Sequence, residues 1–241
     1  MSYTVTNPAT GEQLAAYPTI SDADLAETIA RANAATRGWG RSSSIAERSA
    51  LVRRIGDLHS ERRDELAKAL VGEMGKPLAQ ADGEGDFAGD IYRWHAEIAA
   101  EELADTPIGL RAGSGSAVIR NSPLGVILGV MPWNFPFYQV ARFAGPNLAI
   151  GNSVLLKPAS QCPHTGELIA KIYADAGAPS GAFEMILAST TQIADVIADP
   201  RVQGVSLTGS ERAGIAVAEQ AARHLKKVVL ELGGADPFIV L

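Results

Sequence analysis

Apolar side chains recur at spacings of three and four along the first hundred residues, which predicts amphipathic helices. Ser21 precedes one such pattern and Asp24 stands at the capping-box position, so a helix is expected to begin here. Gly75 and Pro77 are expected to end a longer helical stretch. The apolar positions that define the three stretches are Leu25, Ile29 and Ala32; Leu51, Ile55, Leu58, Leu66, Leu70 and Met74; and Phe87, Ile91, Trp94 and Ile98.

The pattern changes after Ala117, where short apolar, β-rich runs alternate with helical stretches. This alternation is typical of an α/β protein with a doubly wound parallel sheet. The predicted strands are 126–130, 153–157, 183–187, 204–207 and 226–232, and the predicted crossover helices are 136–150, 165–176 and 211–225.

Three parts follow from this pattern. We expect a helical part at 1–112, an extended segment at 113–124 and a parallel sheet at 125–241. The extended segment is expected to pair either with another part of the chain or with a second subunit. The last six residues, 236–241, form an apolar run without a polar tail, which we interpret as a truncation.

Composition narrows the class of protein. The chain has 241 residues, of which 46% are hydrophobic, so it can form a globular core. Its net charge of −6 comes from acidic and basic residues mixed along the chain, which argues against nucleic-acid binding. No apolar run is long enough to span a membrane, and no signal-peptide pattern is present. With the single cysteine Cys162, these features predict a cytoplasmic protein.

Ligands of open α/β sheets bind beyond the carboxyl ends of the strands, so residues that follow each predicted strand are the candidates for chemistry. Asn134 follows the first strand, between Pro132 and Pro136, which restrict the backbone. An amide fixed in this way suits an oxyanion hole. The alternative is that Asn134 only caps the next helix.

Three later strand ends supply further candidates. Lys157 stands at the end of the second strand and could reach a ribose or a phosphate, or be an ordinary surface lysine. Residues 208–214 open a helix whose free N–H groups suit a pyrophosphate, although Gly and Ser also serve turn geometry alone. Glu231 stands at the end of the fifth strand, where partial burial would raise its pKa towards that of a useful general base; otherwise it simply reaches solvent.

Three other candidates are rejected as sites. The run 82–86 resembles the start of a calcium loop but lacks the required Gly and Glu, so we interpret it as a polar helix start. The histidines show no metal-ligand spacing, and no metal site is expected. Cys162 lies on the loop after the second strand, where we expect a packing role.

Four motifs in order resemble the aldehyde dehydrogenase superfamily: PWNFP at 132–136, LLKPAS at 155–160, LTGSERAG at 207–214 and LELGG at 230–234. The resemblance covers essentially the whole chain and is strongest to the succinate-semialdehyde dehydrogenase group. It implies a Rossmann-like sheet of the aldehyde dehydrogenase type. It also implies that the chain is the N-terminal, cofactor-binding half, without the nucleophilic cysteine of the complete enzyme.

The resemblance implies a role for each matching residue. Asn134 would be the oxyanion donor and Glu231 the base that activates the hydrolytic water. Phe135 would line the aldehyde tunnel, and Arg142 would hold a substrate carboxylate, unless it is an ordinary helix-surface arginine. Contacts to the cofactor are implied for Trp133, Lys157, Gly209, Ser210 and Leu232.

The cofactor implied is NAD or NADP. Many members that prefer NAD have Glu where this chain has Ser160, and that Glu repels a 2′-phosphate. With Ser160 there, NADP becomes admissible. The stretch 188–191 also lacks the family's usual Gly-rich turn, so no contact is assigned to it.

Two functions remain open at this point. The first is an oxidoreductase that oxidises an aldehyde, with succinate semialdehyde favoured, through thiolate attack, hydride transfer and hydrolysis. The truncated chain is then expected to be inactive alone. The second is a non-catalytic dinucleotide-binding or structural module. The expected partners are a small-molecule aldehyde and, in the complete protein, further copies in a homodimer or homotetramer, with no nucleic acid or membrane.

Overall fold

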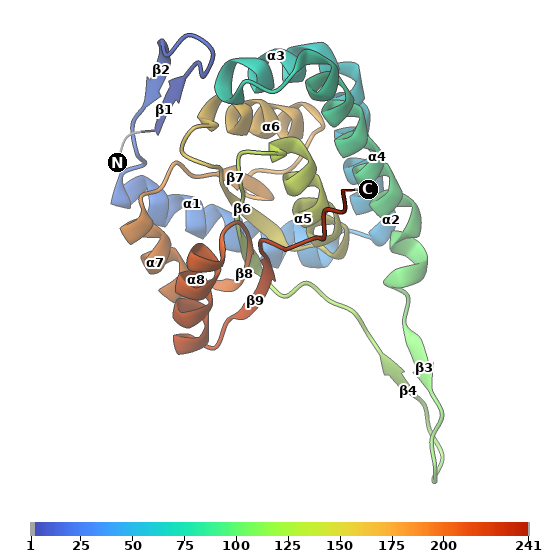
Figure 1. The fold of residues 1–241 in the computed structure, drawn as a ribbon. Helices are drawn as coiled ribbons and strands as arrows, with labels where there is room; N and C mark the ends of the chain where they lie inside the picture. The colour runs from blue at the N-terminus through green and yellow to red at the C-terminus, as the bar shows by residue number, and fades with distance from the viewer. Residues whose placement is uncertain (1–2, 241) are drawn as a thin grey trace.

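A five-stranded parallel sheet forms the centre of the protein in this computed structural model, which describes residues 3–240 (Figure 1). The strand order is β7-β6-β5-β8-β9. Chain connections therefore leave β5 in opposite directions, and the topological switch point lies between β5 and β8. The predicted α/β class with a doubly wound sheet is confirmed. The strands are β5 (Val126–Val130), β6 (Ser153–Lys157), β7 (Phe183–Met185), β8 (Val202–Thr208) and β9 (Lys227–Glu231).

Helices cover both faces of this sheet. On one face lie α5 (Pro136–Ile150) and α6 (Pro163–Asp175), and on the other lie α7 (Thr190–Ala198) and α8 (Glu211–Arg223). Side chains of β5 alternate between the two cores, with Leu128 in one and Ile127 in the other, as the period of a strand requires. The short helix α7 was not among the predicted helices.

The N-terminal helices form further layers around the sheet. α1 (Asp22–Ala35) packs beside α7 in one core and continues into a π-helical turn at Thr36–Gly40. α2 (Ile45–Glu61), α3 (Arg63–Met74) and α4 (Leu78–Glu102) pack behind α5 and α6 in the other core (Figure 1). The cap at Ser21 is confirmed, because its Oγ accepts the N–H of Asp24 at 3.1 Å. None of the helices within residues 3–240 is long and apolar enough to cross a membrane.

Helix α4 does not bury the face that its large apolar residues predicted. Phe87 and Trp94 remain 49% and 55% exposed, while Tyr92, Glu84 and several Ala and Gly residues face inward. The reason is close backbone approach: a Cβ on Gly89 would lie 2.7 Å from the carbonyl oxygen of Gly56 in α2. The interpretation of 82–86 as a helix start is also wrong, since α4 begins at Leu78.

Two hairpins complete the fold. β1 (Tyr3–Thr6) and β2 (Gln13–Tyr17) pair at the N-terminus and were not predicted. β3 (Thr106–Ile108) and β4 (Ala117–Ile119) pair antiparallel in an arm that projects from the body (Figure 1). The predicted extended segment thus pairs in part with another part of the chain. The last residue of the apolar C-terminal run, Leu241, lies outside the described residues.

Candidate active site

A cavity of about 470 Å³ lies at the carboxyl ends of β5, β8 and β9. This is the switch point of the sheet, where open α/β folds bind ligands. It brings together most of the residues predicted from sequence, including both candidate catalytic groups. The lining residues are Pro132, Trp133, Asn134, Gln139, Arg142, Thr208, Gly209, Ser210, Glu231, Leu232 and Gly233.

Asn134 lies in the turn between β5 and α5. Met131, at the start of this turn, donates a backbone hydrogen bond to the carbonyl of Lys157 at 3.1 Å, which holds the turn to the end of β6. The N-cap residue of α5 is Phe135, which provides no side-chain cap. Asn134 is therefore not the cap of this helix, and it lines the cavity instead.

Glu231 and Arg142 meet across the cavity. The guanidinium of Arg142 lies 3.5 Å from a carboxylate oxygen of Glu231 and donates to the hydroxyl of Thr208 at 3.3 Å. The side chain of Glu231 is 51% exposed, so in this chain it reaches solvent as well as the arginine. Gly209 donates its N–H to the carbonyl of Glu231 at 3.0 Å, which joins the ends of β8 and β9.

The start of α8 forms the third wall. Ser210 is its N-cap and accepts the N–H of Ala213 at 3.3 Å, which leaves other first-turn N–H groups available to an anion. A Cβ built on Gly209 would meet only the side chain of Leu207, at 3.7 Å. The fold itself therefore does not require glycine here, and the space beside it is open. A helix start with open space suits a pyrophosphate.

Three predicted residues do not line the cavity. The ammonium of Lys157, at the end of β6, lies 5.4 Å from the ring centroid of Tyr3, and burial lowers its pKa. Ser160 is exposed in the following turn. The ring of Phe135 lies over the ammonium of Lys76 at 3.6 Å and against Tyr138, on the side of α4.

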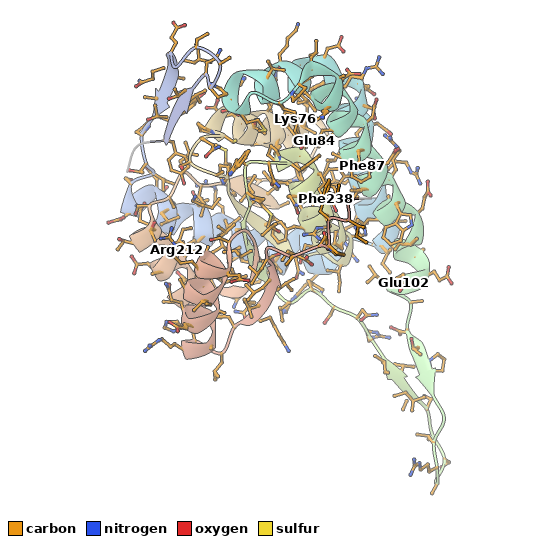
Figure 2. All side chains as sticks on the ribbon, in the orientation of Figure 1. Lys76, Glu84, Phe87, Glu102, Arg212 and Phe238 are labelled. Atoms are coloured by element: carbon orange, nitrogen blue, oxygen red, sulfur yellow. The ribbon has the colours of Figure 1, made fainter. Side chains whose placement is uncertain are left out.

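Sequence reasoning missed a buried ion pair behind Asn134. Lys76 and Glu84 form a salt bridge with side chains only 7% and 0% exposed, where α3 and α4 meet the start of α5 (Figure 2). A usable signal was present, since Glu84 lies between glycines on a helix face of small residues. Such faces pack closely, so a charge on one has to be paired.

Cys162 lies in the interior of the protein. It is fully buried, which confirms its packing role. Burial and the nearby carboxylates of Glu73 and Glu84 raise the pKa of its thiol, which disfavours the reactive thiolate. Within residues 3–240 no group of three or more His, Cys, Asp or Glu is placed to hold a metal ion.

Comparison with known proteins decides the family. A profile described as the Aldehyde dehydrogenase family matches residues 1–241. The chain belongs to the aldehyde dehydrogenase family. Among its relatives, a succinate-semialdehyde dehydrogenase [NADP(+)] of Deinococcus radiodurans is 47% identical over 99% of this chain and 50% of its own length. A succinate semialdehyde dehydrogenase [NAD(P)+] of Escherichia coli is 42% identical over 98% of this chain and 50% of its own.

Solved structures of other aldehyde dehydrogenases agree. Succinic semialdehyde dehydrogenase from Streptococcus pyogenes, in complex with NADP+ as the cofactor, superimposes with a TM-score of 0.94 and 39% identity. The superposition covers 99% of this chain and 52% of the Streptococcus pyogenes chain. The chain thus spans about half the length of the aldehyde dehydrogenases it matches. The predicted resemblance, to one half of a succinate-semialdehyde dehydrogenase, is confirmed.

Proposed function

We propose that this chain is the cofactor-binding half of an enzyme that oxidises an aldehyde to a carboxylic acid with NAD+ or NADP+. Succinate semialdehyde is the proposed substrate. One observation carries the proposal: Asn134, Glu231, Arg142 and the start of α8 line a single cavity at the switch point of the sheet. The relatives from Deinococcus radiodurans and Escherichia coli are succinate-semialdehyde dehydrogenases that use NADP+ and NAD(P)+ respectively, which supports the same substrate and admits either cofactor.

The residues present fit a dinucleotide. The start of α8 at Gly209 and Ser210 would bind the pyrophosphate, and Trp133 and Lys157 would contact the adenosine and ribose. The backbone of Leu232 would lie near the nicotinamide. Ser160 carries no charge that would oppose a 2′-phosphate, so NADP+ is admissible beside NAD+. When bound, NAD(P)+ would accept the hydride from the substrate.

The chain's own residues would then act on the substrate side. The amide of Asn134 would donate to the oxygen of the aldehyde as it becomes an oxyanion. Glu231 would take a proton from the water that releases the acid. Arg142 has more N–H donors than its contacts to Glu231 and Thr208 use, so its planar fork could also bind the substrate carboxylate. The attacking cysteine would come from outside this chain, because Cys162 is buried.

Asn134→Ala in the complete protein tests the catalytic assignment. We expect kcat with succinate semialdehyde to fall by about 10²–10³, the usual effect of losing an oxyanion donor, while NADP+ still binds. Asn33→Ala, in α1 and outside the cavity, is the matched control and should keep kcat. An unchanged kcat in Asn134→Ala would contradict the proposal. If the wild type binds NADP+ but oxidises no aldehyde, the non-catalytic dinucleotide-binding module is the better account.

Arg142→Ala tests the substrate. We expect kcat/KM to fall much further for succinate semialdehyde than for a neutral aldehyde of the same chain length. Equal losses on the two aldehydes would refute the carboxylate contact. They would leave the role of Asn134 untouched.

We also propose that the complete protein is a homodimer or homotetramer, joined in part by the β3–β4 arm. The arm exposes Ile108, Leu110, Val118 and Ile119, an apolar surface that a second copy could cover. Ile119→Asp should reduce the mass measured by light scattering. An unchanged mass would mean that the arm is not part of the interface.

A further inference from the structure

The first turn of α5 is held by a carboxylate from another helix. Glu84, in α4, accepts the backbone N–H of Phe137 at 2.9 Å and that of Tyr138 at 3.4 Å. These N–H groups have no partner inside their own helix, and the N-cap residue Phe135 offers none. Glu84 therefore supplies the cap of α5 from a distant part of the chain.

A buried cation completes the arrangement on its other side. The ammonium of Lys76 pairs with Glu84 and also lies 3.6 Å from the ring centroid of Phe135. One end of this ion pair thus holds the helix that follows Asn134, and the other end contacts the residue directly after Asn134. Both groups lie outside the cavity, so neither can touch a ligand in it.

We infer that Lys76 and Glu84 are positioning residues, which fix the 131–136 turn so that the amide of Asn134 faces the cavity. The turn has a second attachment at Met131, so it is held at both ends. The importance of this position for catalysis rests on the proposed function. The positioning itself does not, because it can be measured without a reaction.

A residue that only stabilises the fold should not affect the 131–136 turn, and Glu73 is such a residue for comparison. Glu73, in α3, accepts the N–H groups of His164 and Thr165 at the start of α6 at 2.8 and 2.9 Å. It is as buried as Glu84 and caps a neighbouring helix in the same way. The helix that Glu73 caps is α6, whereas the 131–136 turn leads into α5, so loss of Glu73 should lower stability without moving that turn.

Trp133 provides the readout in the 241-residue chain. It adjoins Asn134, and replacing the other two tryptophans, as Trp39→Phe and Trp94→Phe, leaves it as the single reporter. Time-resolved anisotropy and acrylamide quenching of Trp133 are then compared for Glu84→Gln, Lys76→Met and Glu73→Gln. Glu84→Gln keeps the size and an acceptor but loses the charge, so it should still fold.

We expect lower anisotropy and stronger quenching of Trp133 in Glu84→Gln and Lys76→Met, well below the unfolding temperature, and wild-type values in Glu73→Gln. If all three variants leave Trp133 unchanged, or all three loosen it equally, the inference is overturned. If Lys76→Met does not fold, Glu84→Gln against Glu73→Gln decides alone.

Kinetics of the complete protein provide a second test of the inference. Glu84→Gln should lower kcat about tenfold to a hundredfold, the effect of a misplacement near 1 Å, with little change in the KM for NADP+. A loosened Trp133 with an unchanged kcat would refute the catalytic importance of the position. Suppose that Trp133 is loosened in Glu84→Gln but that Asn134→Ala keeps full activity. This pair of results would contradict the proposed function and leave the positioning role intact.

Discussion

Helices α7 and α8 begin at serines that cap them locally, whereas α5 and α6 begin at prolines and are capped by glutamates from α4 and α3. Ser189 and Ser210 each accept an N–H three residues ahead. The N-cap residues of α5 and α6 provide no side-chain cap, and Glu84 and Glu73 take their place. The helices on both faces of the sheet therefore have their first N–H groups capped, by a local serine on one face and by a glutamate remote in sequence on the other.

The difference concerns how the cavity is built. The start of α8, on one wall, is specified by its own few residues. The turn that carries Asn134, on another wall, depends on contacts with α3 and α4, which are remote in sequence. Disturbing α3 or α4 should therefore affect the Asn134 wall and spare the α8 wall.

Glu84→Ala should have the largest effect on stability. It leaves Lys76 buried without its partner and two N–H groups of α5 without an acceptor. We expect the free energy of unfolding to fall by about 3–5 kcal/mol, measured by urea denaturation of the 241-residue chain. A loss below about 1 kcal/mol would mean that the pair is not a real support of α5.

Acidification should weaken the α5 side next. His59 is fully buried beside Tyr92 and Phe137, and burial lowers its pKa from 6.5 to about 4. The unfolded chain therefore takes up this proton first, so the contribution of His59 is present above pH 6.5 and is lost as the pH falls through about 4. The shift corresponds to about 3 kcal/mol. The difference in unfolding free energy between wild type and His59→Gln should shrink over this window; a constant difference would contradict the assignment.

Glu73→Ala should cost less than Glu84→Ala, although both remove a remote cap. Burial raises the pKa of Glu73, so its charged form is penalised in the folded state, and removing it relieves part of that cost. The remaining loss is the unpaired N–H groups of α6, about 1–3 kcal/mol. Equal losses of unfolding free energy in the two variants would mean that the buried cation beside Glu84 makes no difference to the cap.

Ser189→Ala, on the locally capped side, should have the smallest effect. Its hydroxyl accepts the N–H of Gln192 at 3.2 Å in a capping box. Loss of such a cap costs about 1 kcal/mol, and hydrogen exchange should rise only in α7. Faster exchange in α5 as well would show that the two sides are not independent.

The same difference explains what the sequence could and could not predict. The ranges of β5 and β6, the cap at Ser21 and the glycine end of α3 follow from local patterns and were predicted. The cap of α5 was not, because Glu84 and Phe137 are 53 residues apart and only the fold brings them together. The inward face of α4 was missed because close approach to Gly56 selects small residues over Phe87 and Trp94.

The candidate site divides along similar lines. Residues directly after β5, β8 and β9 could be predicted to converge, since parallel strands place their carboxyl ends at one edge. That Phe135 faces Lys76 depends on side-chain packing across elements, and no spacing in the sequence contains that information. The cytoplasmic location and the boundaries of the three parts stay predictions.

The most direct test of the account is the affinity of the complete protein for NADP+ after Gly209→Leu. A Cβ at this position makes only an ordinary contact with Leu207, at 3.7 Å, and the rest of the leucine side chain would extend into the space at the start of α8. With Gly83→Leu on the exposed face of α4 as the control, we expect Kd for NADP+ to rise at least about tenfold in Gly209→Leu alone, at an unchanged Tm. A Kd equal to that of the wild type would mean that the cavity at the ends of β5, β8 and β9 does not bind the cofactor.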